Sequence, residues 1–538
     1  MSPGAVPVAP GTPGTSGASG AGGGNTKLAK LLGVEGGSMA MALTPPVEEA
    51  KPWFLKYDYE AREVTFNMEN QLTGGTLRAL VERLTLHDAT IDPEFASAFL
   101  LTFRAFVDPV QLVTMLRARF LMPFPEGLSR AEIALWEDKK LSPVRIRVFN
   151  IIKLWIDAYY DESKDEKGMK ALETFILEDM RERTPRYAER LLEGLERLKW
   201  NGSGGKGGAG SGNIPYTISK SMAQTLRDRG LSGILELDAG EVARQLTIIA
   251  SRRFCAIRSF ELLDQGWLKG GSQDSRNVRA LSELSNQITA WVAETVLYER
   301  ETRRRAGLLK HIIKIAEKCQ HLGNYDTLMA ILAALNSTAI ERLRRTWEFV
   351  PNRSKVTLAE LRRITDHSRN YAEYRAKLRA TSPPCTPFLG VYLTDLVFTG
   401  DGNPDVRRQL IPDKDPSVSP IRIINFDKYA KISAIIRDLQ RFQMPYSLTS
   451  SPDLQEYLKE MWAKSRSSGD PSILYKASEA IEPREEEPSR GGVGGGGGPM
   501  NGHTDADGGP GTGGGGALTT GMGNGEVGGG EGKEAVTV

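Results

Sequence analysis

The sequence predicts an all-α protein with two helical domains flanked by disordered tails. Three observations support this prediction. Apolar residues recur every three or four positions over most of the chain, strand-like alternation is scarce, and glycine-rich tracts bound the periodic regions. With 40% hydrophobic residues in 538, the chain has enough apolar material for a real core.

The glycine-rich tracts set the expected domain bounds. Residues 1–50 are rich in Gly, Pro, Ala and Ser, and residues 467–538 pass through an acidic stretch into glycine runs. Such segments bury too little apolar surface to fold. The tract NGSGGKGGAGSGN at 201–213 is typical of a flexible linker. We therefore expect helical domains at 51–200 and 214–466, with disordered tails on either side.

Helical spacing supports each domain in turn. In the first domain it occurs at 77–84, 95–106 and 144–160. In the second it occurs at 308–319 and 328–335, and further helices are expected at 357–380 and 426–443. Each pattern places an apolar face on one side of a helix, as in a protein built of packed helices.

The segment from Ser382 to Pro404 combines a proline turn, a short helix and an abrupt stop. Its three prolines at 383, 384 and 387 fix φ and prevent a helix from running through them, so a new helix should start afterwards and cover Gly390–Thr399. The run Asp401-Gly402-Asn403-Pro404 predicts its end. Val397 and Asp401 are four residues apart and would share one face near the tip. The pattern alone also fits an ordinary helix–turn element packed into a core.

Composition narrows the class of partner and the compartment. The net charge of +2 provides no overall field for recruiting nucleic acid or an anionic membrane. Three scattered cysteines, at 255, 319 and 385, favour reduced thiols inside a cell. No apolar stretch approaches the roughly 18 residues of a membrane span. We expect a soluble, cytoplasmic protein.

Motifs for ordinary chemistry are missing from the sequence. It contains no phosphate-binding glycine loop and no nucleophile elbow between a strand and a helix. Cys319 and His321 lack a second pair at zinc spacing, so we expect no metal and no cofactor. The basic run Arg303–Arg305 precedes an amphipathic helix and is interpreted as its solvated face. Together these features favour a protein whose surface acts on another protein.

Two long blocks give the chain a recognisable resemblance. They are ERETRRRAGLLKHIIKIAEKCQHLGNYDTLMAILAALNSTAIERLRRTWE at 299–348 and LRATSPPCTPFLGVYLTDLVFTGDGNPD at 378–405. Both closely resemble the catalytic domain of Ras-family guanine-nucleotide exchange factors of the Son-of-sevenless type. The flanking segments 241–269 and 421–448 extend this resemblance over about 235–465. Upstream, 74–85 and 99–113 resemble the N-terminal Ras exchanger motif.

The resemblance implies a function without bond-making chemistry: exchange of GDP for GTP on a Ras-family small GTPase of Ras or Rap type. A helical hairpin, corresponding to about 388–438, would be inserted beside the nucleotide and magnesium site of the partner. The implied catalytic residues are Val397, Asp401, Thr394 and Phe388. The implied GTPase-binding residues are Met329, Asn336, Tyr371, Phe388 and Asn286.

The same resemblance implies the state and location of the complex. Binding should be tightest to the nucleotide-free GTPase, because two ligands that weaken each other do so reciprocally. The protein would not insert into the bilayer and would reach membranes peripherally through its GTPase. Two alternatives stay open: a GTPase-binding scaffold of the same fold that does not catalyse exchange, and an unrelated α-helical adaptor.

Overall fold

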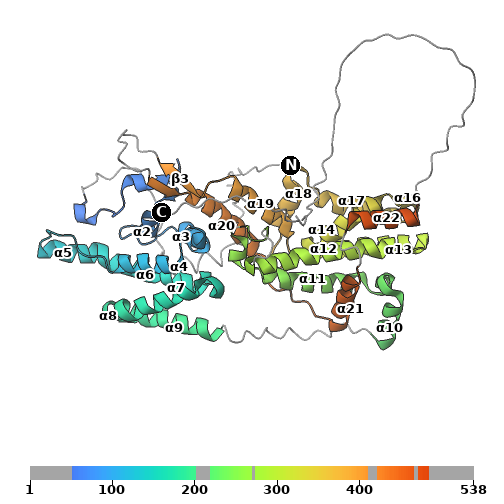
Figure 1. Cartoon of the computed structure of the whole chain (residues 1–538), viewed down its shortest axis with the longest axis horizontal. Coiled ribbons are helices and arrows are strands. Elements are labelled where there is room, and N and C mark those ends of the chain that lie inside the picture. Colours follow the sequence, from blue (N-terminus) through green and yellow to red (C-terminus); the bar gives the residue numbers. More distant parts are fainter. Residues whose placement is uncertain are drawn as a thin grey trace, which may run out of the picture. The chain divides into compact units, whose positions relative to one another are not determined.

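The chain folds into helices over most of the residues that the structure, a computed structural model, describes (Figure 1). These residues are 51–201, 219–263, 265–268, 273–409, 421–465 and 470–483. The expected tail at 1–50, nearly all of the linker and the glycine-rich C-terminal part lie outside them. The helical fold class is confirmed. A small sheet, which the sequence analysis did not predict, is the main addition.

The first part of the chain, up to Asn201, is a bundle of helices with two short strands. Its regular elements are β1 (Val64–Phe66), β2 (Leu72–Gly75), α2 (Leu77–Arg83), α3 (Pro93–Thr102), α4 (Pro109–Phe120), α5 (Arg130–Trp136), α6 (Ser142–Leu154), α7 (Glu162–Phe175), α8 (Arg181–Arg183) and α9 (Pro185–Asn201). Short 3₁₀ or π segments are η1 (Trp53–Leu55), η2 (Ala61–Glu63), η3 (Phe103–Ala105), η4 (Glu137–Leu141), η5 (Trp155–Tyr159) and η6 (Ile176–Met180).

Local sequence explains where these helices begin. Asp92 and Asp108 each accept a hydrogen bond from a backbone N–H of the first turn, and each is followed by a proline. An acidic cap followed by proline is a strong start signal, because proline lacks the N–H that a first turn leaves unpaired. The helices then bury apolar side chains such as Phe99, Phe103 and Trp155 in a common core.

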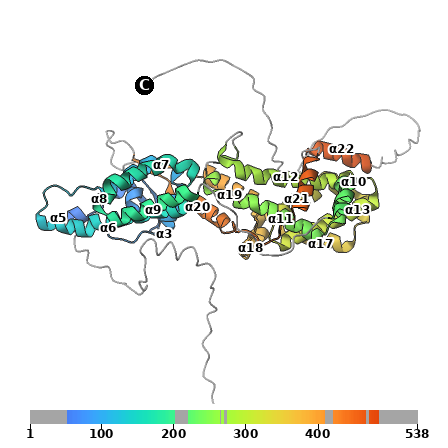
Figure 2. The same cartoon turned by 90° about the horizontal axis from the view of Figure 1, so that it is seen from below.

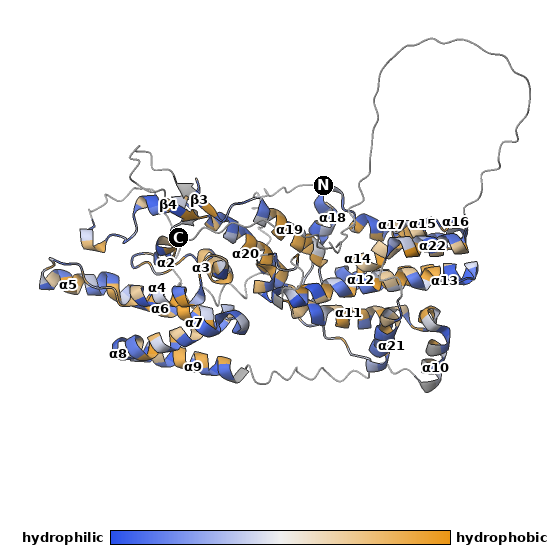
Figure 3. Cartoon of the chain, in the orientation of Figure 1, coloured by the Kyte–Doolittle hydropathy of each residue, from blue (hydrophilic) through white to orange (hydrophobic). Residues whose placement is uncertain are grey.

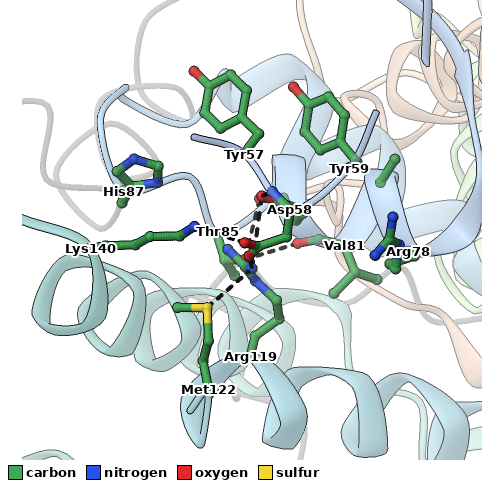
Figure 4. A network of polar contacts seen from close by, with 12 residues as sticks. Tyr57, Asp58, Tyr59, Arg78, Val81, Thr85, His87, Arg119, Met122 and Lys140 are labelled. Atoms are coloured by element: carbon green, nitrogen blue, oxygen red, sulfur yellow. Dashed lines mark hydrogen bonds and ion pairs between the residues drawn. The ribbon is translucent and has the colours of Figure 1, made fainter. Parts of the chain in front are cut away.

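A partly buried network of charged groups attaches the start of the described chain to this bundle (Figure 4). The Asp58 carboxylate accepts hydrogen bonds from Lys140 Nζ at 2.7 Å and from Arg119 Nη1, while Asp58 N–H donates to Glu82 at 2.7 Å. Burial alone would raise the pKa of Asp58, but the bond and charge of Lys140, with Arg119, outweigh it and lower the pKa. Because Glu82 is buried, its own pKa is raised.

The second part of the chain, from Lys220 onward, is a larger helical domain. Its regular elements are α10 (Lys220–Arg229), α11 (Ala239–Cys255), α12 (Arg276–Leu297), α13 (Thr302–His321), α14 (Tyr325–Leu335), α15 (Thr338–Glu341), α16 (Arg344–Glu348), α17 (Asn352–Ile364), α18 (Ser368–Arg379), α19 (Leu389–Asp401), β3 (Val406–Gln409), β4 (Ile421–Ile424), α20 (Phe426–Gln440), α21 (Pro452–Ala463) and α22 (Pro471–Ile481). Short 3₁₀ segments are η7 (Gly230–Glu236), η8 (Ser259–Leu262) and η9 (Gln273–Ser275).

The core of this domain lies between α11, α12, α13 and α14, which pack against one another. Figure 3 shows α14 and α19 as mostly hydrophobic ribbons. Of the side chains on α14, Leu328, Ile331 and Leu335 are almost completely buried. This buried framework supports the segments that carry the candidate site.

The small sheet joins the two parts of the chain. Its strand order is β1-β2-β4-β3, and every neighbouring pair is antiparallel. Gly75 of β2 pairs with Ile424 of β4. A side chain at Gly74 would place its Cβ 2.8 Å from Ile423 Cγ2 and from the Ile424 carbonyl oxygen, so the close approach of β2 and β4 requires glycine.

Two further expectations from the sequence are corrected, and one is confirmed. The helix expected at 357–380 is two helices, α17 and α18, separated by a break at 365–367. The helix end predicted at Asp401–Pro404 is confirmed, because α19 ends at Asp401 with Gly402 as its C-cap. Residues 471–481, placed in a disordered tail, form α22 because Leu474 is buried and Glu482 binds the core.

Arg305 contradicts the interpretation of the basic run as a solvated face. Its side chain is completely buried. Its Nη2 lies 3.0 Å from Glu482 Oε1, and its Nε donates to Thr346 Oγ1 at 2.7 Å. A charge is stable in this position only because an opposite charge and hydrogen-bond acceptors surround it.

Candidate functional site

Two helices, α19 and α20, form a hairpin whose connection contains β3 and β4. The helices are adjacent in both views (Figures 1 and 2). Tyr392 of α19 donates its hydroxyl to Asp438 of α20 at 2.7 Å. Lys428 of α20 donates to the Gly400 carbonyl at 2.8 Å, near the C-terminal end of α19, where a positive charge is favourable. The hairpin is thus fastened at both ends.

A buried carboxylate anchors the beginning of α19. Asp326, in the first turn of α14, accepts a hydrogen bond from Ser285 of α12 at 2.5 Å and a longer one from Leu389 N–H at 3.4 Å. Only 3% of Asp326 is exposed, and burial raises its pKa to about 6. Asp326 therefore links three helices at the base of the hairpin.

The raised pKa of Asp326 has a defined consequence for stability. The folded carboxyl binds its proton more tightly than the unfolded one. The protonated carboxyl therefore contributes fully to the free energy of unfolding at a pH below the pKa that Asp326 has in the unfolded chain. This contribution is lost as the pH rises through about 6, the pKa of Asp326 in the folded chain. At neutral pH the ionised, desolvated carboxylate costs the fold stability. The contacts that Asp326 makes with Ser285 and Leu389 therefore come with a cost in stability at neutral pH.

An aromatic cluster surrounds the first residue of the hairpin. Tyr374 is buried, and its hydroxyl accepts a hydrogen bond from Phe388 N–H at 2.8 Å. The Tyr371 and Phe388 ring centroids are 6.2 Å apart, and the Tyr371 and Tyr374 centroids are 6.5 Å apart. These separations are within the range of favourable ring contacts. The structure therefore brings together Tyr371 and Phe388, two residues that the resemblance implies at the GTPase surface.

The backbone that carries Tyr371 is strained. Arg369, Asn370 and Tyr371 have φ values of 51°, 55° and 57°, so three successive residues other than glycine are left-handed. This conformation costs roughly 1–2 kcal/mol per residue for L-amino acids, somewhat less for asparagine. Such strain persists only where surrounding contacts impose it, and it is concentrated at functional sites.

The outer part of α19 presents a mixed apolar and acidic surface. Thr394 is exposed, Val397 is half-buried against the core, and Asp401 is exposed at the last position of the helix. The Asp401 carboxylate accepts a hydrogen bond from Gln265 Nε2 at 2.9 Å. Phe398 is 73% exposed and was missed in the sequence analysis. Its position four residues after Thr394 is a signal that could have identified it.

The remaining sequence-predicted residues lie on α12 and α14. Met329 is half-buried one turn after Tyr325, whose ring centroid is 5.4 Å from that of Tyr374. Asn336 is exposed at the C-terminal end of α14, where its Oδ1 accepts from Arg362 at 2.7 Å. Asn286 is exposed on α12, directly after Ser285. Met329 and Asn286 thus neighbour the residues that anchor α19.

Three further features of the described residues concern metal ligands, cysteine thiols and membrane spans. They contain no group of three or more His, Cys, Asp or Glu side chains that could hold a metal ion. Burial raises the pKa of Cys385 to about 12 and also raises that of Cys319. In the same part of the chain, no helix is both long and apolar enough to cross a membrane.

Comparison with known families matches residues 241–430 to the RasGEF domain and residues 71–176 to the RasGEF N-terminal motif. The chain carries a RasGEF domain and a RasGEF N-terminal motif. The RasGEF domain covers the helical core and ends in the first third of α20, so it includes α19 and all the sequence-predicted site residues. The N-terminal motif covers β2 through α7.

Relatives of this RasGEF chain support the assignment. Cell division control protein 25 of Candida albicans is 32% identical over 451 residues, which are 81% of this chain and 32% of that protein. Ras guanine nucleotide exchange factor J of Dictyostelium discoideum is 33% identical over 434 residues, 78% of this chain and 49% of that protein. The chain therefore spans about a third of the length of the first relative and about half of the length of the second.

Proposed function

We propose that this RasGEF chain is an exchange catalyst that binds a Ras-family small GTPase and accelerates release of its GDP. The observation that carries the proposal is the match of the RasGEF domain to the helical core that bears the hairpin. The name of the Dictyostelium discoideum relative, a Ras guanine nucleotide exchange factor, points to the same activity. No bond is made or broken in this reaction, which agrees with the absence of catalytic motifs from the sequence.

The outer part of α19 has the features of a wedge. Val397 and Phe398 offer apolar surface beside the exposed Thr394 and Asp401. A small GTPase holds its nucleotide partly through phosphate and Mg²⁺ contacts made by its switch segments. An apolar side chain near the metal, and a carboxylate near the phosphates, would remove favourable interactions of the nucleotide. We assign Val397, Asp401 and Thr394 to this step.

A second surface would hold the GTPase while the wedge acts. We assign this role to Tyr371 and Phe388, whose rings are in contact, together with Met329, Asn336 and Asn286 on α12 and α14. The aromatic pair provides apolar area on a rigid base, because Tyr374 and Asp326 fix the backbone beside Phe388. Rigid aromatic anchors of this kind commonly dominate the energy of protein interfaces.

The energetics favour a broad interface over a single contact. Every 1.36 kcal/mol removed from a barrier gives a tenfold rate increase, so an acceleration of about 10⁵ requires roughly 7 kcal/mol. Linkage requires that GDP weaken the complex by the factor by which the complex weakens GDP binding. The nucleotide-free GTPase is therefore the expected tight partner, and membrane association would follow from that partner.

The test is release of a fluorescent GDP analogue from purified Ras and Rap in the presence of the full chain. Phe388→Ala and Asp401→Ala should each reduce the acceleration strongly. Phe349→Ala serves as the control for loss of a surface aromatic ring, because Phe349 is 51% exposed and lies outside the hairpin, whereas Phe388 is half-buried. Tight binding of nucleotide-free GTPase without faster release would contradict catalysis and leave a scaffold role.

A further inference from the structure

Arg375 of α18 makes contacts to two separate parts of the candidate site. Its guanidinium forms a bidentate ion pair with Asp395 of α19, with Nη1–Oδ2 and Nη2–Oδ1 distances of 2.7 and 2.8 Å. The same group donates from Nε to the Asn370 carbonyl at 2.9 Å and from Nη2 to Asn370 Oδ1 at 3.2 Å. One side chain therefore connects the hairpin to the left-handed turn at 369–371.

The turn and the hairpin meet again at the aromatic pair. Tyr371 is the last left-handed residue of the turn, and its ring contacts that of Phe388, which immediately precedes α19. Arg375 binds Asn370, which is next to Tyr371 in the chain. It also binds Asp395, which lies about two helical turns after Phe388. Of the three residues in the turn, only Asn370 adopts the left-handed conformation at reduced cost, so contacts such as these are needed to hold all three.

We propose that Arg375 is a positioning residue that locks the hairpin helix α19 to the turn carrying Tyr371. The lock preserves Tyr371 and Phe388 as one preformed docking surface for the GTPase. This inference rests on the proposed exchange function, although its structural part can be tested without a GTPase. It concerns Arg375 and Asp395, neither of which is among the residues assigned to contact the partner.

The chemistry of the contact explains why arginine occupies this position. Its planar guanidinium offers donors in a fixed fork and can satisfy a carboxylate and a backbone carbonyl at once. A lysine would supply the charge without that geometry. About a quarter of the Arg375 side chain and of the Asp395 side chain is exposed. The ion pair is therefore partly shielded from solvent.

The first measurement is amide hydrogen exchange in the full chain, without a GTPase. Arg375→Gln should accelerate exchange in the peptide covering 366–374 by about tenfold or more, since local opening controls this rate. Glu373→Gln is the matched control, because Glu373 lies on the same helix and makes an exposed ion pair with Arg363. Equal exchange in the two variants would overturn the proposal whether or not the protein acts on a GTPase.

The second measurement is the maximal rate of GDP release at saturating chain. Arg375→Gln should lower it by about tenfold, equivalent to roughly 1.4 kcal/mol. In a Tyr371→Ala background the same substitution should have less than about a twofold effect, because residues acting through one another are not additive. Arg375→Lys should restore little of the lost rate.

The results distinguish the positioning role of Arg375 from the proposed exchange function. A tenfold loss in both backgrounds would show that Arg375 does not act through Tyr371 and would overturn the proposal. A parent chain that releases no GDP would refute the proposed function. In that case faster hydrogen exchange in Arg375→Gln alone would still support the lock.

Discussion

The contact between Arg305 and Glu482 allows a sharp prediction about stability. Glu482 follows α22, and 7% of it is exposed. Its carboxylate accepts hydrogen bonds from Arg305 Nη2 at 3.0 Å, Thr346 N–H at 3.0 Å and Arg345 N–H at 3.1 Å. Glu482→Ala would leave a fully buried guanidinium without its counter-charge.

The expected cost of Glu482→Ala follows from the contacts that remain. Removing one partner of a buried ion pair typically costs about 3–5 kcal/mol. Arg305 would still donate to the Glu299 carbonyl at 2.8 Å and to Thr346 Oγ1 at 2.7 Å. These acceptors favour the lower end of the range. We therefore expect a loss of about 3 kcal/mol, or roughly 6–12 °C in Tm for a domain of this size.

Urea unfolding of the full chain, followed by circular dichroism, measures this loss. Glu482→Gln retains the shape and some hydrogen bonds and should cost about half as much. The control Glu373→Ala breaks an exposed pair and should change the free energy of unfolding by no more than about 0.5 kcal/mol. If Glu482→Ala lowered the free energy of unfolding by as little as the control does, the Arg305–Glu482 pair would not be essential for packing α22 against the core.

Three further substitutions test other parts of the structure. Asp326→Asn removes the carboxyl whose pKa is raised to about 6. Because the parent loses stability as that carboxyl ionises and the variant does not, the free energy of unfolding of the variant minus that of the parent should increase by about 1 kcal/mol from pH 5 to pH 7.5. If the free energies of unfolding of the parent and the variant changed equally with pH, the raised pKa of Asp326 would be contradicted. Gly74→Ala should cost about 1–3 kcal/mol in urea unfolding, because its Cβ would lie 2.8 Å from Ile423 Cγ2. A neutral effect would mean that β2 and β4 are not tightly apposed. Phe426→Ala should cost about 3–5 kcal/mol, because the Phe426 side chain is buried beside Phe95 with ring centroids 4.9 Å apart. Thermal unfolding checks this value, and a shift within 2 °C would argue against that packing.

Sequence periodicity predicted the helices well because burial of an apolar stripe determines them locally. The helix expected at Gly390–Thr399 is observed at Leu389–Asp401, and the one expected at 426–443 is Phe426–Gln440. The strands were missed because each has only three or four residues. The pair that joins the two parts of the chain, Gly75 of β2 with Ile424 of β4, also links residues far apart in sequence. A period of two cannot be recognised over so short a run.

The candidate site was only partly predictable for a related reason. Phe388 and Tyr371 follow from the resemblance to exchange factors, and the structure adds that their rings are in contact. Arg375, Asp326 and Arg305 could not be identified, because nothing in a local pattern distinguishes a buried or clamped charge from a solvated one. Their significance depends on partners between 5 and 177 positions away.

The hairpin is held by both parts of the chain, and this shared support bears on how the N-terminal motif contributes. On one side, Asp326, Tyr374 and Arg375 fix α19 to the RasGEF core. On the other side, β4 pairs with β2, and Phe426 and Tyr429 of α20 are buried in the core of the N-terminal helices.

A chain reduced to the RasGEF domain would expose these α20 side chains and leave the inner edge of β4 unpaired. The exposed aromatic rings would make the second helix of the hairpin the less stable one. The N-terminal motif therefore stabilises α20, while the lock at Arg375 fixes α19, so the orientation of the proposed wedge depends on two independent sets of contacts.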